Sequence, residues 1–288
     1  MISCCIYLPV GCDIYKDETL IANKTVPCQV AILKDLRAMW KQGTPAFGPF
    51  VQLNSPGICE ILGHAGFDYC IIDLEHGVIH VDTAENMVRA SIAAGIVPIV
   101  RVAFNRPELI SQALNIGASG VHIPHISTVE EAQQAVFASK FFPMGGRGVC
   151  PFVRAARYSV DKTIYYNKAN METMVIVAIE GTEGIDNLGE ILKVKGIDVI
   201  FVGPYDLSQS LGVPGQVTSQ KVVDKVREIA VMSKKAGVAV GLFVETPEAA
   251  KEWARQGVLY VSLDVDAAIL LKASMNYVEQ VHEGAGAR

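Results

Sequence analysis

Two acidic residues near the middle of the chain, Glu180 and Asp206, stand where apolar runs of strand length end. Residues 174–179 (MVIVAI) lead into Glu180, and residues 199–202 (VIFV) lead into GPYD, which closes with Asp206. The segment between them has apolar residues on one helical face, which predicts a strand–helix–strand unit of a parallel sheet. Ligands collect at the carboxyl ends of such strands. Two carboxylates there can share Mg²⁺ or Mn²⁺ and leave coordination positions for water and a chelating substrate.

The same two positions have a simpler explanation, which the pattern leaves open. Acidic residues are common at helix starts because they interact favourably with the helix dipole. Glu180 would then cap the following helix, and Asp206 would be an N-cap before Leu207. In that case neither carboxylate would be a metal ligand.

Apolar runs of strand length recur along the chain and alternate with helical patterns. They occupy residues 45–53, 67–72, 97–100, 120–124, 174–179, 199–202, 238–244 and 258–263. Thr128 with Glu131, and Asp82 with Glu85, have the spacing of a capping box at a helix start. Residues 142–158, rich in Gly, Pro and Arg, interrupt the alternation and predict a long loop. Eight strands alternating with helices in 288 residues predict an α/β fold, a (β/α)₈ TIM barrel.

Charged residues gather at the carboxyl ends of these predicted strands. The set is Asp73, Glu75, His76, Arg101, His125, Glu180, Asp206 and Glu245. Barrel enzymes keep their active sites at this face, and an inert barrel would not require such a gathering. The pattern therefore predicts an active site at the mouth of the barrel.

Composition restricts the partners and the compartment. The net charge is −5 with Lys and Arg scattered, which argues against nucleic acid and anionic membranes as partners. No apolar stretch approaches the roughly 18 residues of a spanning helix. The seven Cys form no CxxC pair, which favours a reduced, cytoplasmic compartment. We interpret residues 1–27 as an N-terminal extension of unknown role and residues 28–288 as a single barrel domain.

Five motifs resemble, in their order along the chain, those of the HpcH/HpaI family of metal-dependent (class II) 2-oxo acid aldolases. They are IIDLEHG (71–77), PIVRV (98–102), GGRGV (145–149), VAIE (177–180) and FVGPYDLSQSLG (201–212). The likeness runs from about residue 33 to the final helix. It implies a barrel of the phosphoenolpyruvate/pyruvate type, with Glu180 and Asp206 as ligands of Mg²⁺ or Mn²⁺, and Co²⁺ as a further option.

The resemblance also implies a reaction. Such an enzyme cleaves a 4-hydroxy-2-oxo acid to pyruvate, or a close 2-oxo acid, and an aldehyde through a metal-bound enolate, with the metal acting as Lewis acid. Arg101 matches the family's arginine that binds the substrate and stabilises the enolate. His76 and Asp73 match its acid/base dyad, which would remove the hydroxyl proton.

Further residues at the mouth are expected to contact the substrate. By the resemblance, Gly203 and Pro204 belong to a segment whose backbone approaches the substrate carboxylate. Tyr205 stands where family members carry a small residue, and Ala178 where some carry glutamine, so the substrate's size is left open. His125 is expected at the aldehyde half of the substrate.

Other functions remain open at this stage. An oxaloacetate decarboxylase or a condensing enzyme would use the same metal enolate. A CoA-ester lyase of the citrate-lyase β type would need a basic patch for a nucleotide diphosphate, which the sequence does not show. A Schiff-base aldolase would need a buried lysine at a strand end, whereas Lys193 and Lys195 lie in the 189–197 linker. A barrel without catalytic activity could serve as an assembly subunit.

The expected partners are small molecules and further copies of the chain. The reaction above would bring a 2-oxo acid and an aldehyde to the site. The resemblance implies a homo-oligomer, a trimer or a hexamer, in which the C-terminal helix is exchanged. The apolar run at residues 267–271 would suit such an exchange, although it would also pack within one subunit.

Overall fold

The computed structural model of the protein describes residues 32–160 and 162–284. The extension predicted for residues 1–27 lies outside these residues. The predicted domain boundary at residue 28 does as well, so it stays a prediction.

The strands and helices alternate along the chain. In order, they are α1 (Leu36–Lys41), β1 (Ala46–Val51), α2 (Pro56–His64), β2 (Tyr69–Asp73), α3 (Val81–Ala93), β3 (Val97–Arg101), α4 (Pro107–Asn115), β4 (Gly120–Ile123), α5 (Val129–Ser139), the 3₁₀ helix η1 (Arg154–Ser159), α6 (Tyr165–Glu172), β5 (Met174–Ile179), α7 (Thr182–Asp186), α8 (Leu188–Ile191), β6 (Val199–Val202), α9 (Pro204–Ser210), α10 (Gln220–Ala236), β7 (Ala239–Val244), α11 (Pro247–Arg255), β8 (Tyr260–Val265) and α12 (Asp266–Gly284).

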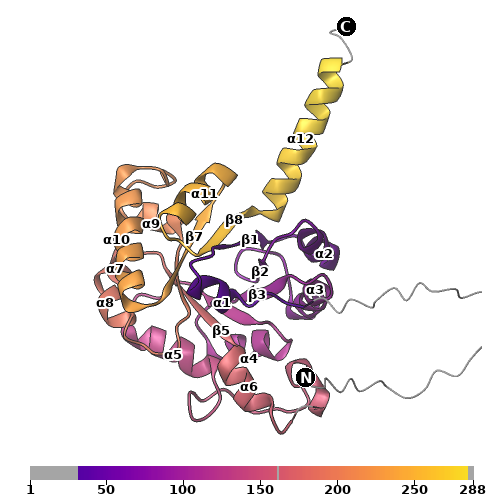
Figure 1. Cartoon of the computed structure of the whole chain (residues 1–288), viewed down its shortest axis with the longest axis vertical. Coiled ribbons are helices and arrows are strands. Elements are labelled where there is room, and N and C mark those ends of the chain that lie inside the picture. Colours follow the sequence, from indigo (N-terminus) through magenta and orange to yellow (C-terminus); the bar gives the residue numbers. More distant parts are fainter. Residues whose placement is uncertain (1–31, 161, 285–288) are drawn as a thin grey trace, which may run out of the picture. The chain divides into compact units, whose positions relative to one another are not determined.

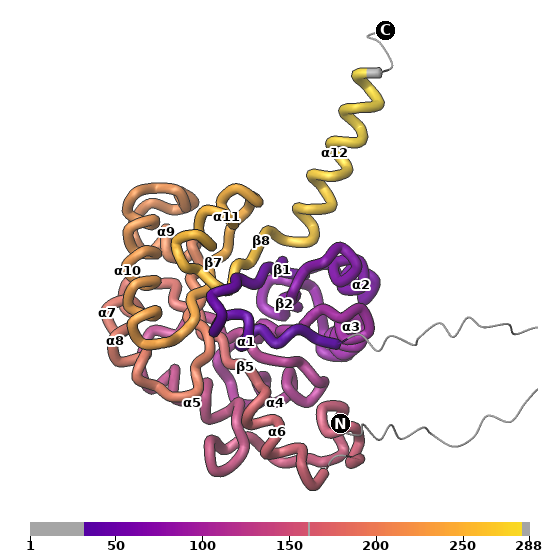
Figure 2. The backbone as a smooth tube through the Cα atoms, in the orientation of Figure 1, coloured from indigo at the N-terminus to yellow at the C-terminus, as the bar shows by residue number. Residues whose placement is uncertain are grey.

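The eight strands form one closed parallel barrel in sequence order, with β8 pairing back onto β1 (Figure 1). The chain winds round it once, from the indigo β1 to the yellow β8 beside it (Figure 2). Because every strand is parallel, all eight carboxyl ends open at the same face. The predicted (β/α)₈ barrel is therefore confirmed.

Two cores flank the strands, because successive side chains of a strand point to opposite faces. Outward residues such as Ile72 and Val100 join the layer between barrel and helices. Inward residues such as Ile71 and Ile99 fill the barrel interior. The strands are continuous apolar runs in the sequence, because both faces of the sheet are buried.

The amino-terminal end of the barrel is closed by large rings. Tyr69 and Tyr260, the first residues of β2 and β8, stack at 4.1 Å between ring centroids, and Trp40 of α1 meets Tyr260 edge-on. Gly48 makes this possible, because a Cβ there would lie 2.0 Å from the carbonyl oxygen of Tyr69. We call Trp40, Tyr69 and Tyr260 the barrel floor.

Local signals predicted some element boundaries and missed others. The capping box of Thr128 and Glu131 is formed at the start of α5. The capping box expected of Asp82 and Glu85 is not, because the N-cap of α3 is His80, two residues before Asp82. The single helix expected between β5 and β6 is two short helices, α7 and α8.

The last helix, α12, differs from the other helices in its exposure. Figure 1 shows it extending away from the barrel. Its apolar side chains stay exposed along its length: Leu270, Leu271, Met275, Tyr277, Val278 and Val281. In the described part of the chain, no helix is both long enough and apolar enough to span a membrane.

Candidate active site

A pocket of about 350 Å³ opens at the carboxyl ends of the strands. Most of the residues predicted for the site line it. The lining is Phe50, Gln52, His76, Arg101, Glu180, Phe201, Gly203, Pro204, Tyr205, Asp206, Phe243 and Val265. Asp73 and His125 lie just behind this lining, because each bonds directly to one of its residues.

Arg101 is held between two carboxylates beneath the pocket. Its Nε and Nη2 donate to Asp73 at 2.8 and 2.7 Å, and its Nη1 lies 3.0 Å from Glu75. The β2–β3 register sets this contact, since Asp73 pairs directly with Arg101. A guanidinium has five N–H donors, so these three contacts leave two for a ligand. Arg101 thus forms ion pairs with Asp73 and Glu75 and still lies in the pocket wall.

Asp73 is fully buried but accepts several hydrogen bonds. Besides Arg101, it accepts from Gln52 Nε2 at 2.9 Å and from the backbone N–H groups of Glu75 and His76. Burial alone would raise the pKa of Asp73, but the bonds and charge of Arg101 outweigh burial and hold the pKa below its ordinary value. Asp73 is therefore a fixed anion that positions Arg101.

Gln52 is a site residue that the sequence did not reveal. It follows β1, and its backbone N–H donates to Asp266 Oδ1 at 2.9 Å. Asp266, the first residue of α12, is buried and so connects the end of the chain to the end of β1. The residue after β1 is uncharged, so the pattern of charged residues at strand ends did not include Gln52.

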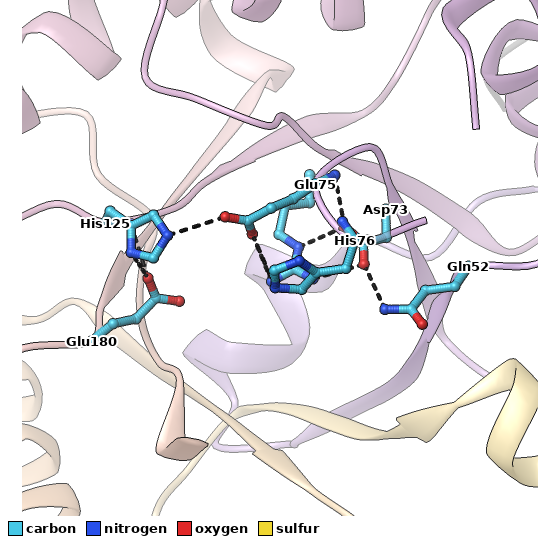
Figure 3. Close-up of polar contacts among 7 residues, drawn as sticks. Gln52, Asp73, Glu75, His76, His125 and Glu180 are labelled. Atoms are coloured by element: carbon cyan, nitrogen blue, oxygen red, sulfur yellow. Dashed lines mark hydrogen bonds and ion pairs between the residues drawn. The ribbon is translucent and has the colours of Figure 1, made fainter. Parts of the chain in front are cut away.

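His76 lies at the outer edge of the pocket. Its ring is 60% exposed, with Nε2 3.9 Å from Glu75 Oε2. The hydrogen bond between Asp73 and His76 runs through the backbone N–H, not through the ring (Figure 3). The structure thus brings the two residues together without forming a carboxylate–imidazole hydrogen bond.

His125 bridges two carboxylates on the other side of the pocket. Its Nδ1 lies 2.8 Å from Glu180 Oε2, its Nε2 lies 3.2 Å from Glu75 Oε1, and its backbone N–H also donates to Glu180 (Figure 3). The residue has a φ of 55°, a left-handed conformation that non-glycine residues rarely adopt. The hydrogen bond to Glu180 raises the pKa of His125 to about 9. The imidazole is therefore held as a cation between Glu75 and Glu180.

Glu180 and Asp206 both reach the pocket, as predicted for a shared cation site. Neither is an N-cap: Gly181 caps α7, and Gly203 caps α9. Burial would raise the pKa of Glu180, but the bonds from His125 hold it below its ordinary value. Gly203 leaves room for the Glu180 carboxylate, because a Cβ there would lie 2.8 Å from Oε1.

The carboxylate oxygens of Glu180 and Asp206 fit a hard divalent cation that keeps coordination positions open for a substrate. Carboxylate oxygens are the ligands that Mg²⁺ and Mn²⁺ prefer. Among the described residues no cluster of three or more His, Cys, Asp or Glu has metal-binding geometry. Two protein carboxylates, Glu180 and Asp206, would therefore leave most coordination positions to water and substrate.

The outer wall of the pocket is built by Tyr205 and Phe243, whose ring centroids lie 6.2 Å apart. The hydroxyl of Tyr205 donates a short hydrogen bond to Glu245, which raises the pKa of Tyr205 to about 12. Lys272 of α12 donates to Asp264 Oδ2 at 2.6 Å and to the backbone carbonyl of Glu245. We call Tyr205 and Phe243, together with Glu245, which contacts Tyr205 outside the pocket lining, the outer wall.

His122 lies inside the barrel below the pocket. Its ring packs against Phe50 and Phe201, it is fully buried, and neither ring nitrogen has a hydrogen-bond partner. Burial, helped by the charge of Arg101, lowers the pKa of His122 to about 3. It is therefore neutral in the folded protein.

This buried imidazole makes the protein sensitive to acid. The unfolded chain binds a proton at His122 below about pH 6.5, whereas the folded chain binds it only near pH 3, so stability falls as the pH falls through this window. Between pH 7 and pH 5 the wild type is expected to lose about 2 kcal/mol more free energy of unfolding than His122→Leu. Urea titrations at both pH values measure this difference.

The exposed His80 provides the control. His80→Leu should follow the wild type at both pH values. If the wild type and His122→Leu lost equal stability between pH 7 and pH 5, the neutral buried imidazole would be ruled out.

The opposite end of the barrel holds a larger cavity and a buried lysine. The cavity, about 660 Å³, lies between α1 and α6 and has none of the predicted site residues in its lining. Nearby, Lys140 is buried, and burial lowers its pKa to about 8. Lys140 donates to the carbonyl of Thr173, just before β5 begins, so it lies far from the strand ends that a Schiff-base aldolase would use.

Known proteins resemble this chain over most of its length. Residues 46–273 match the model of the HpcH/HpaI aldolase/citrate lyase family. A 4-hydroxy-2-oxo-heptane-1,7-dioate aldolase of Shigella sonnei (strain Ss046) is 34% identical over 239 residues, which are 83% of this chain and 91% of the relative.

Solved structures of other proteins share this barrel fold. A HpcH/HpaI aldolase/citrate lyase family protein from Burkholderia cenocepacia J2315 has a TM-score of 0.82 and 33% identity, covering 86% of this chain and 98% of the other. The citrate synthase SbnG has a TM-score of 0.77 and 30% identity, covering 86% and 100%. A citrate lyase beta subunit of M. tuberculosis, solved with oxaloacetate and magnesium, shares the fold at a TM-score of 0.54 and 15% identity, covering 81% and 95%.

Proposed function

The chain belongs to the HpcH/HpaI aldolase/citrate lyase family, and from this we propose that it is a divalent-metal-dependent aldolase. Its substrate would be a 4-hydroxy-2-oxo acid, which it would cleave to pyruvate, or a close 2-oxo acid, and an aldehyde. The observation that carries the proposal is one pocket lined by Arg101 and by two carboxylates, Glu180 and Asp206, which follow the neighbouring strands β5 and β6. This is the arrangement that a chelating 2-oxo acid requires.

Glu180 and Asp206 would hold the metal, Mg²⁺ or Mn²⁺ or else Co²⁺. Bound there, it would supply Lewis acidity to the 2-oxo group. A structural neighbour was solved with oxaloacetate and magnesium, which agrees with this choice of cation. His125 would keep the Glu180 carboxylate oriented toward the pocket through its two contacts.

Arg101 and His76 would carry the charge and proton steps. The two remaining N–H donors of Arg101 would bind the oxyanion that develops when the C3–C4 bond breaks. The ring of His76, at the open edge of the pocket, would accept the C4 hydroxyl proton. Asp73 would fix Arg101 and, through the backbone N–H of His76, the loop that carries the base.

The test is release of pyruvate from a racemic 4-hydroxy-2-oxo acid. Protein treated with EDTA should be inactive, and Mg²⁺, Mn²⁺ or Co²⁺ should restore activity. A protein that releases no pyruvate with any of these metals, and exchanges no pyruvate methyl hydrogen with deuterated solvent, would not be this aldolase.

A second candidate, a decarboxylase or condensing enzyme acting on oxaloacetate, is favoured by the 30% identity to the citrate synthase SbnG. Both reactions pass through the same enolate of a 2-oxo acid. Loss of CO₂ from oxaloacetate, without pyruvate release from the hydroxy acid, would identify the second candidate.

The remaining parts of the proposal concern assembly and compartment. We assign the barrel to the phosphoenolpyruvate/pyruvate type. We also propose a homo-oligomer, a trimer or a hexamer, because the apolar side chains of α12 are exposed in the single chain. The thiols of Cys59 and Cys70 are free and buried, which agrees with a cytoplasmic location.

A further inference from the structure

We infer that the outer wall selects substrates whose aldehyde half is uncharged and disfavours a second carboxylate. This inference rests on the proposed function and concerns the tail of the substrate beyond C4. It sets this chain apart from the Shigella relative, which is named for a substrate with carboxylates at both ends.

The tail of the substrate would lie at the outer side of the pocket. Glu180, Asp206 and Arg101 would hold the 2-oxo acid end, so the tail extends away from them. Tyr205, next to Asp206 in the sequence and 45% exposed, lines the same pocket farther out. Its ring faces Phe243, so the tail would run past the outer wall.

The outer wall carries the negative charge of Glu245. Tyr205 donates its hydroxyl hydrogen to Glu245, so the wall presents a carboxylate and a hydroxyl oxygen. Lys272 is the basic side chain beside Glu245, but its ammonium group is already paired with Asp264 at 2.6 Å. A carboxylate on the tail would therefore meet like charge at the wall.

In the part of the chain that the structure describes, no other cation at the pocket is free for the tail, because the imidazole of His125 is already paired with Glu180 and Glu75. Among the described residues that line the pocket, Arg101 is the one permanent cation, and it already faces Asp73 and Glu75. Its remaining N–H donors point to the 2-oxo acid end in the proposed function. The rings of Phe243 and Tyr205 instead form an apolar surface, which suits an uncharged substrate tail.

Two substrates that differ only at the tail's end test the inference. 4-Hydroxy-2-oxoheptane-1,7-dioate and 4-hydroxy-2-oxoheptanoate share every carbon, but the first ends in a carboxylate where the second ends in a methyl group. Cleavage of C3–C4 releases pyruvate from both, with succinic semialdehyde from the first and butanal from the second. The wild type is expected to favour the heptanoate at least about tenfold in kcat/KM at low ionic strength.

Glu245→Gln removes the charge of the wall and keeps the shape of the side chain. We expect it to reduce the preference for the heptanoate about tenfold, mainly by improving kcat/KM for the dioate. Glu248→Gln is the matched control, because Glu248 is exposed in the first turn of α11 and changes the net charge equally. It should leave the preference as in the wild type.

The outcomes separate this inference from the proposed function. Pyruvate release with an equal or greater kcat/KM for the dioate would overturn the inference and keep the aldolase. An unchanged preference in Glu245→Gln would overturn the role of the wall. Absence of both pyruvate release and deuterium exchange into pyruvate would remove the proposed function, and the inference with it.

Discussion

Glu180→Gln is expected to lower kcat/KM for the proposed cleavage by roughly 10³-fold or more. The substitution keeps the volume of the side chain against Gly203 but removes one of the two anionic oxygen donors facing the pocket. Pyruvate release with saturating Mn²⁺ measures the effect on activity. Binding of Mn²⁺, followed by its electron paramagnetic resonance signal, measures the effect on the metal.

The control for this variant is Glu183→Gln, which removes an exposed carboxylate in the first turn of α7. It should retain wild-type activity and wild-type Mn²⁺ binding. If Glu180→Gln kept more than a tenth of the activity, or bound Mn²⁺ as the wild type does, Glu180 would not be a metal ligand.

Arg101→Met is expected to lower the free energy of unfolding by about 3–5 kcal/mol at pH 7, as well as abolish activity. The reason is Asp73, which would remain fully buried after losing its charged partner. The deficit should shrink as the pH falls from 7 toward about 4. In the variant the uncompensated Asp73 takes up a proton in this range, whereas in the wild type Arg101 keeps the pKa of Asp73 low.

A double-mutant cycle isolates this interaction. Asp73→Asn combined with Arg101→Met should be more stable than Arg101→Met alone, because the buried anion is gone. Urea unfolding of the four proteins at pH 7 provides the measurement. Additive losses from the two single substitutions would show that the pair is not coupled.

The sequence was sufficient to predict the barrel and the face on which the site lies. Strands buried on both faces leave long apolar runs, and most runs here are followed by a charged residue that marks the mouth. The predicted grouping of Arg101, Glu180 and Asp206 in one pocket follows from this regularity. Arg101 ends β3, Glu180 follows β5 directly, and Asp206 lies in α9, which follows β6.

The contacts within the site were harder to predict, because they depend on loop conformation and on pairs distant in sequence. His125 reaches Glu180 because its backbone adopts a φ of 55°, which no sequence signal marked. Gln52 was not predicted as a site residue, because it is uncharged and the prediction rested on charged residues that follow the strands. The bond from Tyr205 to Glu245 joins the start of α9 to the residue after β7, 40 positions away, and sequence alone indicated only that Tyr205 is unusually large.

The barrel floor has a consequence for the order of events at the site. Trp40, Tyr69 and Tyr260 fill the amino-terminal end of the interior, so reactants and products share the mouth as their route. Under the proposed function, the 2-oxo acid lies on the inner side, against Arg101, and the aldehyde on the outer side, against Tyr205. Aldehyde must then depart before pyruvate, and in the reverse direction pyruvate must enter first, so the enzyme would work by a compulsory sequence.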